Sequence, residues 1–128
     1  MQQPDGREVV MQLIAAYQEE ATLYAGLEEA AAEQRRLLAN GRDTERLAGL
    51  VERQSKLAEH IGKIEAGIAP LREHWEKTRD HARDARVLAL AQTLDRLLDE
   101  LAERIHHIVE IEKENSRVLI AVRAASGA

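Results

Sequence analysis

Histidines and carboxylates are the residues of this 128-residue chain whose types and spacing could do chemistry. Glu103 and His106 have the Glu-x-x-His spacing with which di-iron helical bundles hold their metal. Such a site needs two copies of the motif and two further carboxylates that face the bundle interior, but this chain has one copy. With Leu101 and Ile108 at a positions of a heptad, both motif residues fall on the solvent face. We therefore expect no metal site and no cofactor.

Residue patterns typical of enzymes are also missing. The chain contains no cysteine, which excludes disulfide bonds and thiolate catalysis. Its glycines are dispersed and form neither a phosphate-binding loop nor a Gly-x-Ser-x-Gly motif. The adjacent carboxylates 19–20 and 28–29 are expected to be solvated, because a catalytic pair needs a pocket around it. We therefore predict no catalytic residues and a protein that is not an enzyme.

Charge and hydropathy exclude two further classes of function. The net charge of −5 argues against a nucleic-acid-binding protein, which needs a basic face for phosphates. No apolar run approaches the roughly 20 residues of a membrane span. The first residues lack the basic and apolar regions of a secretory signal. We therefore expect a cytoplasmic protein.

Apolar residues recur at helical spacing in three long segments that fill almost the whole chain. Aromatic residues make up only 2% of the sequence, so the core must come from Leu, Ile, Val and Ala. The clearest turn is residues 40–43, where Gly41 is expected to end one helix and Asp43 or Thr44 to cap the next. We predict a single domain over residues 1–128, with helices at about 6–39, 44–79 and 84–123.

The second segment contains a proline within its apolar seam. Pro70 removes one helix hydrogen bond, and its ring clashes with the preceding turn. The seam nevertheless keeps its phase from Leu47 to Trp75, with Gln54 as its polar interruption. We predict a kink near Pro70, with a helix boundary at Ala69 as the alternative. Because short loops make neighbouring helices antiparallel, the expected fold is all-α, an up-down-up bundle of three long helices with coiled-coil-like packing.

The end of the third segment carries the candidate binding residues, whereas the first two seams are expected to close on their own. Asn115 lies on the third seam and either fixes the helix register or contacts a partner. A three-helix core can bury Val118, Leu119 and Val122, and Ile120 then points away. Exposed apolar surface at a helix end marks an interaction site, although a simply buried end is the alternative. The predicted partner-binding residues are Asn115, Val118, Leu119, Ile120 and Val122.

The order of these segments resembles that of the FlgN-type flagellar export chaperones. The resemblance covers nearly the full length and rests on residues 37–43, 45–57, 61–65 and 112–119. The last stretch is similar to the family's Glu-x-x-Asn-x-x-x-Leu pattern. The resemblance implies a cytoplasmic chaperone that binds hook–filament junction (hook-associated) proteins and delivers them to the flagellar type III export gate. It also implies that the C-terminal part of the last helix binds the cargo.

Two alternatives stay open at this point. The related FliT-type chaperones are also small and helical. A structural coiled-coil or adaptor subunit, whose seams close only in a homo-oligomer, would show the same heptad spacing. A monomer with an exposed apolar end favours the chaperone, whereas a tight tetramer favours the scaffold.

Overall fold

The computed structural model describes residues 6–126 except residue 42, with side chains up to residue 121. The helices are α1 (Gly6–Asn40), α2 (Thr44–Thr78), the short 3-10 helix η1 (Arg79–His81) and α3 (Ala85–Ser126). This part of the chain contains no strand. The predicted all-α chain with three long helices is confirmed, and α3 extends past the expected end at residue 123.

The first turn is built by one glycine and one aspartate. Gly41 has a φ angle of 119°, in the left-handed region that residues with a Cβ rarely adopt. Asp43 is the N-cap of α2, and its carboxylate accepts a hydrogen bond of 3.1 Å from the Arg46 amide. The predicted role of Gly41 is confirmed, and Asp43 rather than Thr44 is the cap.

The second turn lies at residues 79–84 and contains neither glycine nor proline. Side chains organise it instead. The Arg79 guanidinium lies 5.9 Å from the centroid of the Trp75 ring and 3.6 Å from the Asp95 carboxylate on α3. Asp84 accepts a hydrogen bond of 2.8 Å from the Arg86 amide at the start of α3. Because side-chain contacts rather than glycine or proline form this turn, its position is difficult to predict from the amino-acid composition.

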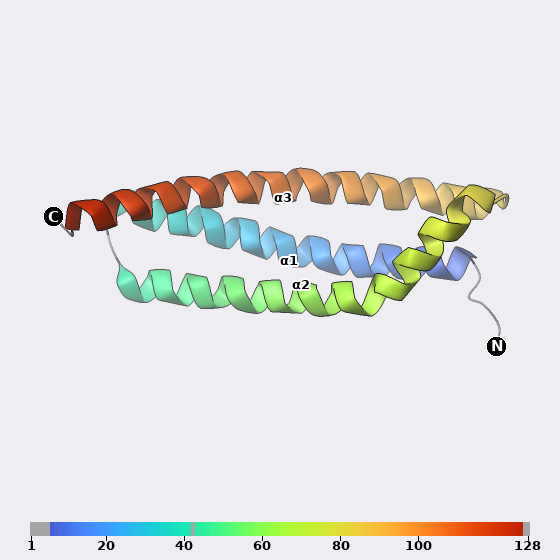
Figure 1. Ribbon diagram of the computed structural model, residues 1–128, viewed down its shortest axis with the longest axis horizontal. Coiled ribbons are helices and arrows are strands. Elements are labelled where there is room, and N and C mark those ends of the chain that lie inside the picture. Colours follow the sequence, from blue (N-terminus) through green and yellow to red (C-terminus); the bar gives the residue numbers. More distant parts are fainter. Residues whose placement is uncertain (1–5, 42, 127–128) are drawn as a thin grey trace.

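The helix α1 is the central element of the molecule. Both α2 and α3 pack along it, and Figure 1 shows α2 returning beside α1 before α3 runs in the first direction again. Within the described residues, however, no Cα atom of α2 lies within 8 Å of one in α3. The bundle is therefore open along one side.

The helix α2 continues through its proline. It extends from Thr44 to Thr78 with Pro70 inside, so it has no boundary at Ala69. Figure 1 shows its second half, in yellow-green, crossing toward the start of α3. Arg72 Nη1 lies 2.5 Å from Glu65 Oε2, in an ion pair that spans the proline within the same helix.

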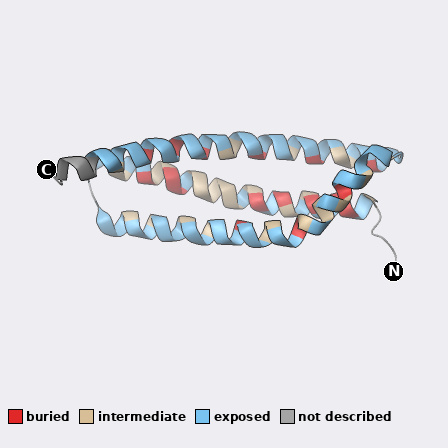
Figure 2. Cartoon of the chain, viewed as in Figure 1, coloured by how far each residue is buried: buried red, intermediate tan, exposed pale blue. Residues whose placement is uncertain are grey.

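Apolar burial is concentrated where α1 begins and α2 ends. Leu13, Trp75 and Leu94 belong to one buried cluster at this end, contributed by all three helices. The first half of α2 contributes no buried side chain, and Figure 2 shows it as mostly exposed. Val51 is 53% exposed. The expectation that the second seam closes on its own is therefore wrong, because the first half of α2 has only α1 beside it and buries none of its seam residues.

Candidate functional site

Asn115 holds the end of α3 against α1. Its side chain is 3% exposed, and its amide nitrogen donates to the Ala31 carbonyl at 3.1 Å and to Gln34 Oε1 at 3.4 Å. Gln54 of α2 donates to the same Gln34 oxygen at 3.5 Å. The polar interruptions of the second and third seams thus meet at one glutamine of α1. This geometry fits the register-fixing role of Asn115, because these contacts are internal to the chain.

The residues that follow Asn115 leave apolar surface uncovered. Val118 is 41% exposed and Ile120 is 67% exposed, while Leu119 is half-buried. The side chain of Val122 lies outside the described residues. The expectation that Val118 is buried is wrong, because α2 does not reach α3 and a single helix covers only one stripe of it.

A hollow of about 350 Å³ lies between the end of α1 and the end of α3, and both helices contribute to its lining. Arg35 and Glu114 form an ion pair of 3.2 Å across the two helices beside it. An apolar floor with a charged rim is the arrangement of protein–protein contact surfaces. The structure therefore brings Asn115 and Val118 together in one hollow, and Leu119 and Ile120 are not part of its lining. The lining residues are Arg35, Leu38, Ala39, Glu114, Asn115, Arg117 and Val118.

The α1 side of this hollow is missing from the sequence-based prediction. Leu38 and Ala39 lie in the last turn of α1, one turn before Gly41. Leu38 occupies an a position when Val10 is placed at a, so its seam position is readable from the sequence. The heptad spacing does not reveal that α3 leaves Leu38 only half-buried.

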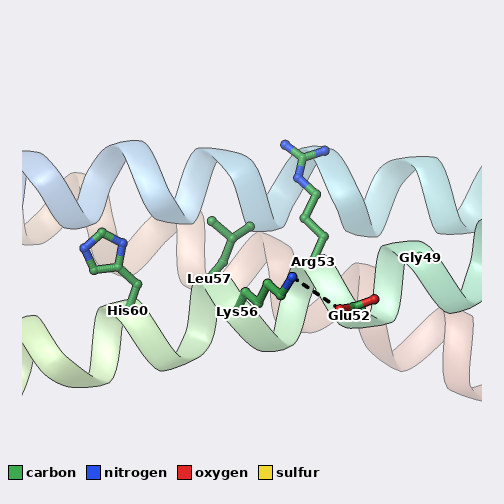
Figure 3. Close-up of a pocket in the computed structure, with 6 residues that line it drawn as sticks. All are labelled: Gly49, Glu52, Arg53, Lys56, Leu57 and His60. Carbon is green, nitrogen blue, oxygen red and sulfur yellow. Dashed lines mark ion pairs between the residues drawn. The ribbon is translucent and has the colours of Figure 1, made fainter.

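A second hollow lies along α2, which supplies all of its lining residues, and Figure 3 shows them beside α1. Lys56 pairs with Glu52 at 3.2 Å, and Arg53 pairs with Glu29 of α1 at 3.8 Å. A Cβ at Gly26 of α1 would come within 3.2 Å of a Leu57 methyl group, so the two helices approach closely here. We assign this hollow to helix packing, because its charges are paired within the chain.

Glu20 is buried, contrary to the expectation that the adjacent carboxylates 19–20 are solvated. It is 1% exposed, and its Oε2 atom has no hydrogen-bond partner within the described residues. Burial raises the pKa of Glu20 to about 8. The hydrogen bond to Glu65 and the charge of Glu65 also raise this pKa, and Arg72 lowers it. Glu20 is therefore mostly protonated at neutral pH, and it lines neither of the two hollows described above.

The histidine motif that suggested metal chemistry is exposed in the structure. Glu103 and His106 both face solvent, and the neighbouring His107 lies 3.1 Å from Glu28 of α1. Within the described residues, no group of three or more His, Cys, Asp or Glu side chains is placed to hold a metal ion. Among the described helices, none is long and apolar enough to cross a membrane.

A comparison with protein families matches residues 1–122 to the family described as FlgN protein. The chain belongs to the FlgN family. The match confirms the resemblance seen in the sequence and covers the candidate residues at the end of α3. No curated protein and no solved structure matches the chain. FlgN proteins are flagellar export chaperones, which places this protein among those that act by binding other proteins.

Proposed function

We propose that this FlgN-family protein is a cytoplasmic export chaperone for hook–filament junction proteins, which it delivers to the flagellar export apparatus. Family membership supports the general role. The observation that supports the binding site is the apolar surface at the end of α3, where Ile120 is 67% exposed. An apolar side chain of this size, exposed at the end of a helix, favours contact with another protein.

The contact between α1 and α3 holds the proposed binding surface in a fixed position. Asn115 ties α3 to the last turns of α1, so the residues after it project from a fixed helix end. Val118 opens onto the hollow beside Leu38, and Ile120 faces solvent. Together with Leu119, they make the end of α3 apolar on more than one side, where an amphipathic cargo helix can bury its own apolar stripe. Val122, whose side chain lies outside the described residues, is assigned to the same site from the sequence. Covering that stripe prevents the cargo from aggregating before export.

We further infer that the protein works as an up-down-up bundle of antiparallel helices, with α2 kinked near Pro70. The proline and the Glu65–Arg72 ion pair across it support the kink. The crossing half of α2 brings Ile68 and Trp75 over the core at one end of the molecule. The other end, which holds the cargo surface, stays open.

Calorimetric titration with the hook–filament junction proteins of the source organism tests the proposal. Ile120→Asp places a charge on the surface and is expected to weaken binding about tenfold or more, because the contact would bury that charge. Leu88→Asp is the matched control, since Leu88 is also exposed on α3 but lies near its other end. Equal affinities for both variants would remove Ile120 from the site. Absence of binding by the native chain would overturn the function.

Light scattering tests the alternative of a structural coiled-coil subunit. A chaperone with an unoccupied apolar surface is expected to be monomeric before cargo is added. A tight tetramer that buries Ile120 would favour the structural role.

A further inference from the structure

Two glycines and one proline lie close together in the middle of α2. Gly62 and Gly67 are exposed and helical, and a Cβ added at either would meet no atom of another helix within 4 Å. Close packing therefore does not require glycine at these positions, although glycine weakens a helix relative to alanine. Together with Pro70, the two glycines make this stretch of α2 easy to bend. We call residues 62–70 the hinge segment.

The part of α2 that precedes the hinge segment is held to α1 by weak contacts. Figure 1 shows this part beside α1, and residues 44–60 contribute no buried side chain. Arg53 pairs with Glu29 at 3.8 Å and His60 with Glu19 at 3.3 Å, and all four side chains are about half exposed or more. Exposed ion pairs contribute little to stability. Residues 44–60 are therefore the part of α2 that can leave α1 most easily.

A polar cluster joins α1 to both sides of Pro70. Glu20 of α1 is 1% exposed, and its carboxyl group lies within hydrogen-bond reach of that of Glu65 in the hinge segment. Arg72, which follows the hinge segment, pairs with Glu65 at 2.5 Å and lies within hydrogen-bond reach of Tyr17 on α1. We call these four residues the latch cluster, because they hold the hinge segment against α1.

The contact between the two carboxyl groups of the latch cluster requires a proton. Two carboxyl groups can form a hydrogen bond only while one of them is protonated. Without that proton, two carboxylates share one guanidinium, and a buried carboxylate without its own cation is strongly disfavoured. The other groups around Glu20 supply no second cation. Burial raises the pKa of Tyr17 and of Tyr24, so both stay neutral, and Arg104 of α3 donates to the Ala21 carbonyl at 3.2 Å.

We propose that α2 opens at the hinge segment when the latch cluster loses its proton, so that residues 44–60 separate from α1. The second half of α2 stays in place, because Trp75 belongs to the buried cluster that all three helices share. Opening withdraws Gln54 from Gln34, the residue to which Asn115 also donates. Protonation in the middle of the bundle is thereby linked to the contact that holds the end of α3.

The pH range of opening follows from the pKa of Glu20. Burial and the neighbouring Glu65 raise this pKa from 4.5 to about 8 in the closed form. Bending at the hinge segment moves Glu65 away and admits water, so the open form releases the proton at lower pH. The ratio of open to closed molecules is expected to rise by up to about tenfold per pH unit from 4.5 to about 8, and to level off above it.

Distances between pairs of spin labels measure this opening, and the chain has no cysteine of its own to react with the label. Thr22→Cys and Ala48→Cys, both at exposed positions, report on α1 and the first half of α2. We expect a population with a longer distance that grows as pH rises through this range. Thr22→Cys with Ala89→Cys on α3 is the control pair, whose distance should not change. A single unchanged distance in the first pair at all these pH values would overturn the proposal.

Two variants locate the titrating group. Glu20→Gln keeps the shape of the side chain without a proton to lose, so it should abolish the pH dependence of opening. His60→Gln removes the surface contact with Glu19 and should leave the pH dependence in place. Loss of the dependence in the His60 variant would overturn the latch cluster, whatever the stability of the Glu20 variant. Retention of the dependence in a folded Glu20 variant would overturn it as well.

Gly67→Ala tests the hinge segment, with Gly49→Ala as its matched control. Both glycines are exposed in α2 with space for a Cβ, and only Gly67 lies in the hinge segment. Gly67→Ala is expected to lower the open population about fivefold, because alanine favours the unbent helix. Gly49→Ala should leave that population unchanged. Equal effects of the two substitutions would contradict bending at residues 62–70.

Discussion

Glu20 places a carboxyl group in the core where α1 meets α2, and this predicts a particular dependence of stability on pH. Its pKa is raised from 4.5 to about 8, so between these values the folded protein keeps a proton that the unfolded chain has released. The free energy of unfolding should therefore fall as pH rises from 4.5 to about 8, and level off above it.

Urea denaturation across this pH range checks the prediction with Glu20→Gln as the comparison. The variant carries a neutral group of the same shape, so its stability should lack this fall. Parallel curves for the native chain and the variant would show that Glu20 does not hold a proton in the folded state.

Asn115 and Ile120 should respond differently to substitution, because one faces the interior and the other solvent. Asn115→Ala leaves the Gln34 oxygen and the Ala31 carbonyl without this donor, which should cost about 1–3 kcal/mol of unfolding free energy. Ile120→Ser should change stability by less than about 0.5 kcal/mol, because the side chain is exposed. Chemical denaturation of both variants measures this difference. Equal losses would contradict the assigned roles.

At the residue scale, part of the interior could be predicted from spacing. With Val10 at a, Glu20 and Gln34 both fall at d positions, which indicates burial for both polar residues. The expectation of a solvated Glu20 followed residue type and overlooked this register. The meeting of Gln34, Gln54 and Asn115 could not be predicted, because heptad spacing places a residue on a seam without naming its neighbour.

At the element scale, the first half of α2 should be the least protected part of the long helices. It has no buried side chain, whereas Leu13 of α1 and Leu94 of α3 are almost fully buried. Hydrogen exchange should therefore be faster at the amides of residues 47–58 than around those two leucines. Uniform protection of all three helices would contradict the open arrangement.

The helices themselves were predictable because capping residues and apolar period act locally. Gly41 and Asp43 carry the first turn, and both signals are visible in the sequence. The gap between α2 and α3 depends instead on the path of α2 after Pro70, which the continuous apolar phase does not reveal. For the same reason, the exposure of Val118 was missed.

At the scale of the whole molecule, α1 lies between α2 and α3, which do not contact each other in the described part of the chain. This arrangement leaves more apolar surface exposed to solvent than a closed three-helix bundle does. The buried apolar side chains of the described chain end at Ile111, before the candidate cargo residues begin. The core and the proposed cargo surface are therefore separable along the sequence. A chain that ends at Glu114 should keep its core and lose the end of α3.

Co-purification of the hook–filament junction proteins with the full chain and with this truncated chain is the most direct test. We expect the full chain to retain the junction proteins. We expect the truncated chain to keep its helical circular dichroism signal and a cooperative unfolding transition, but to lose co-purification. Junction proteins recovered in the same yield with the truncated chain would contradict the assignment of cargo binding to the end of α3.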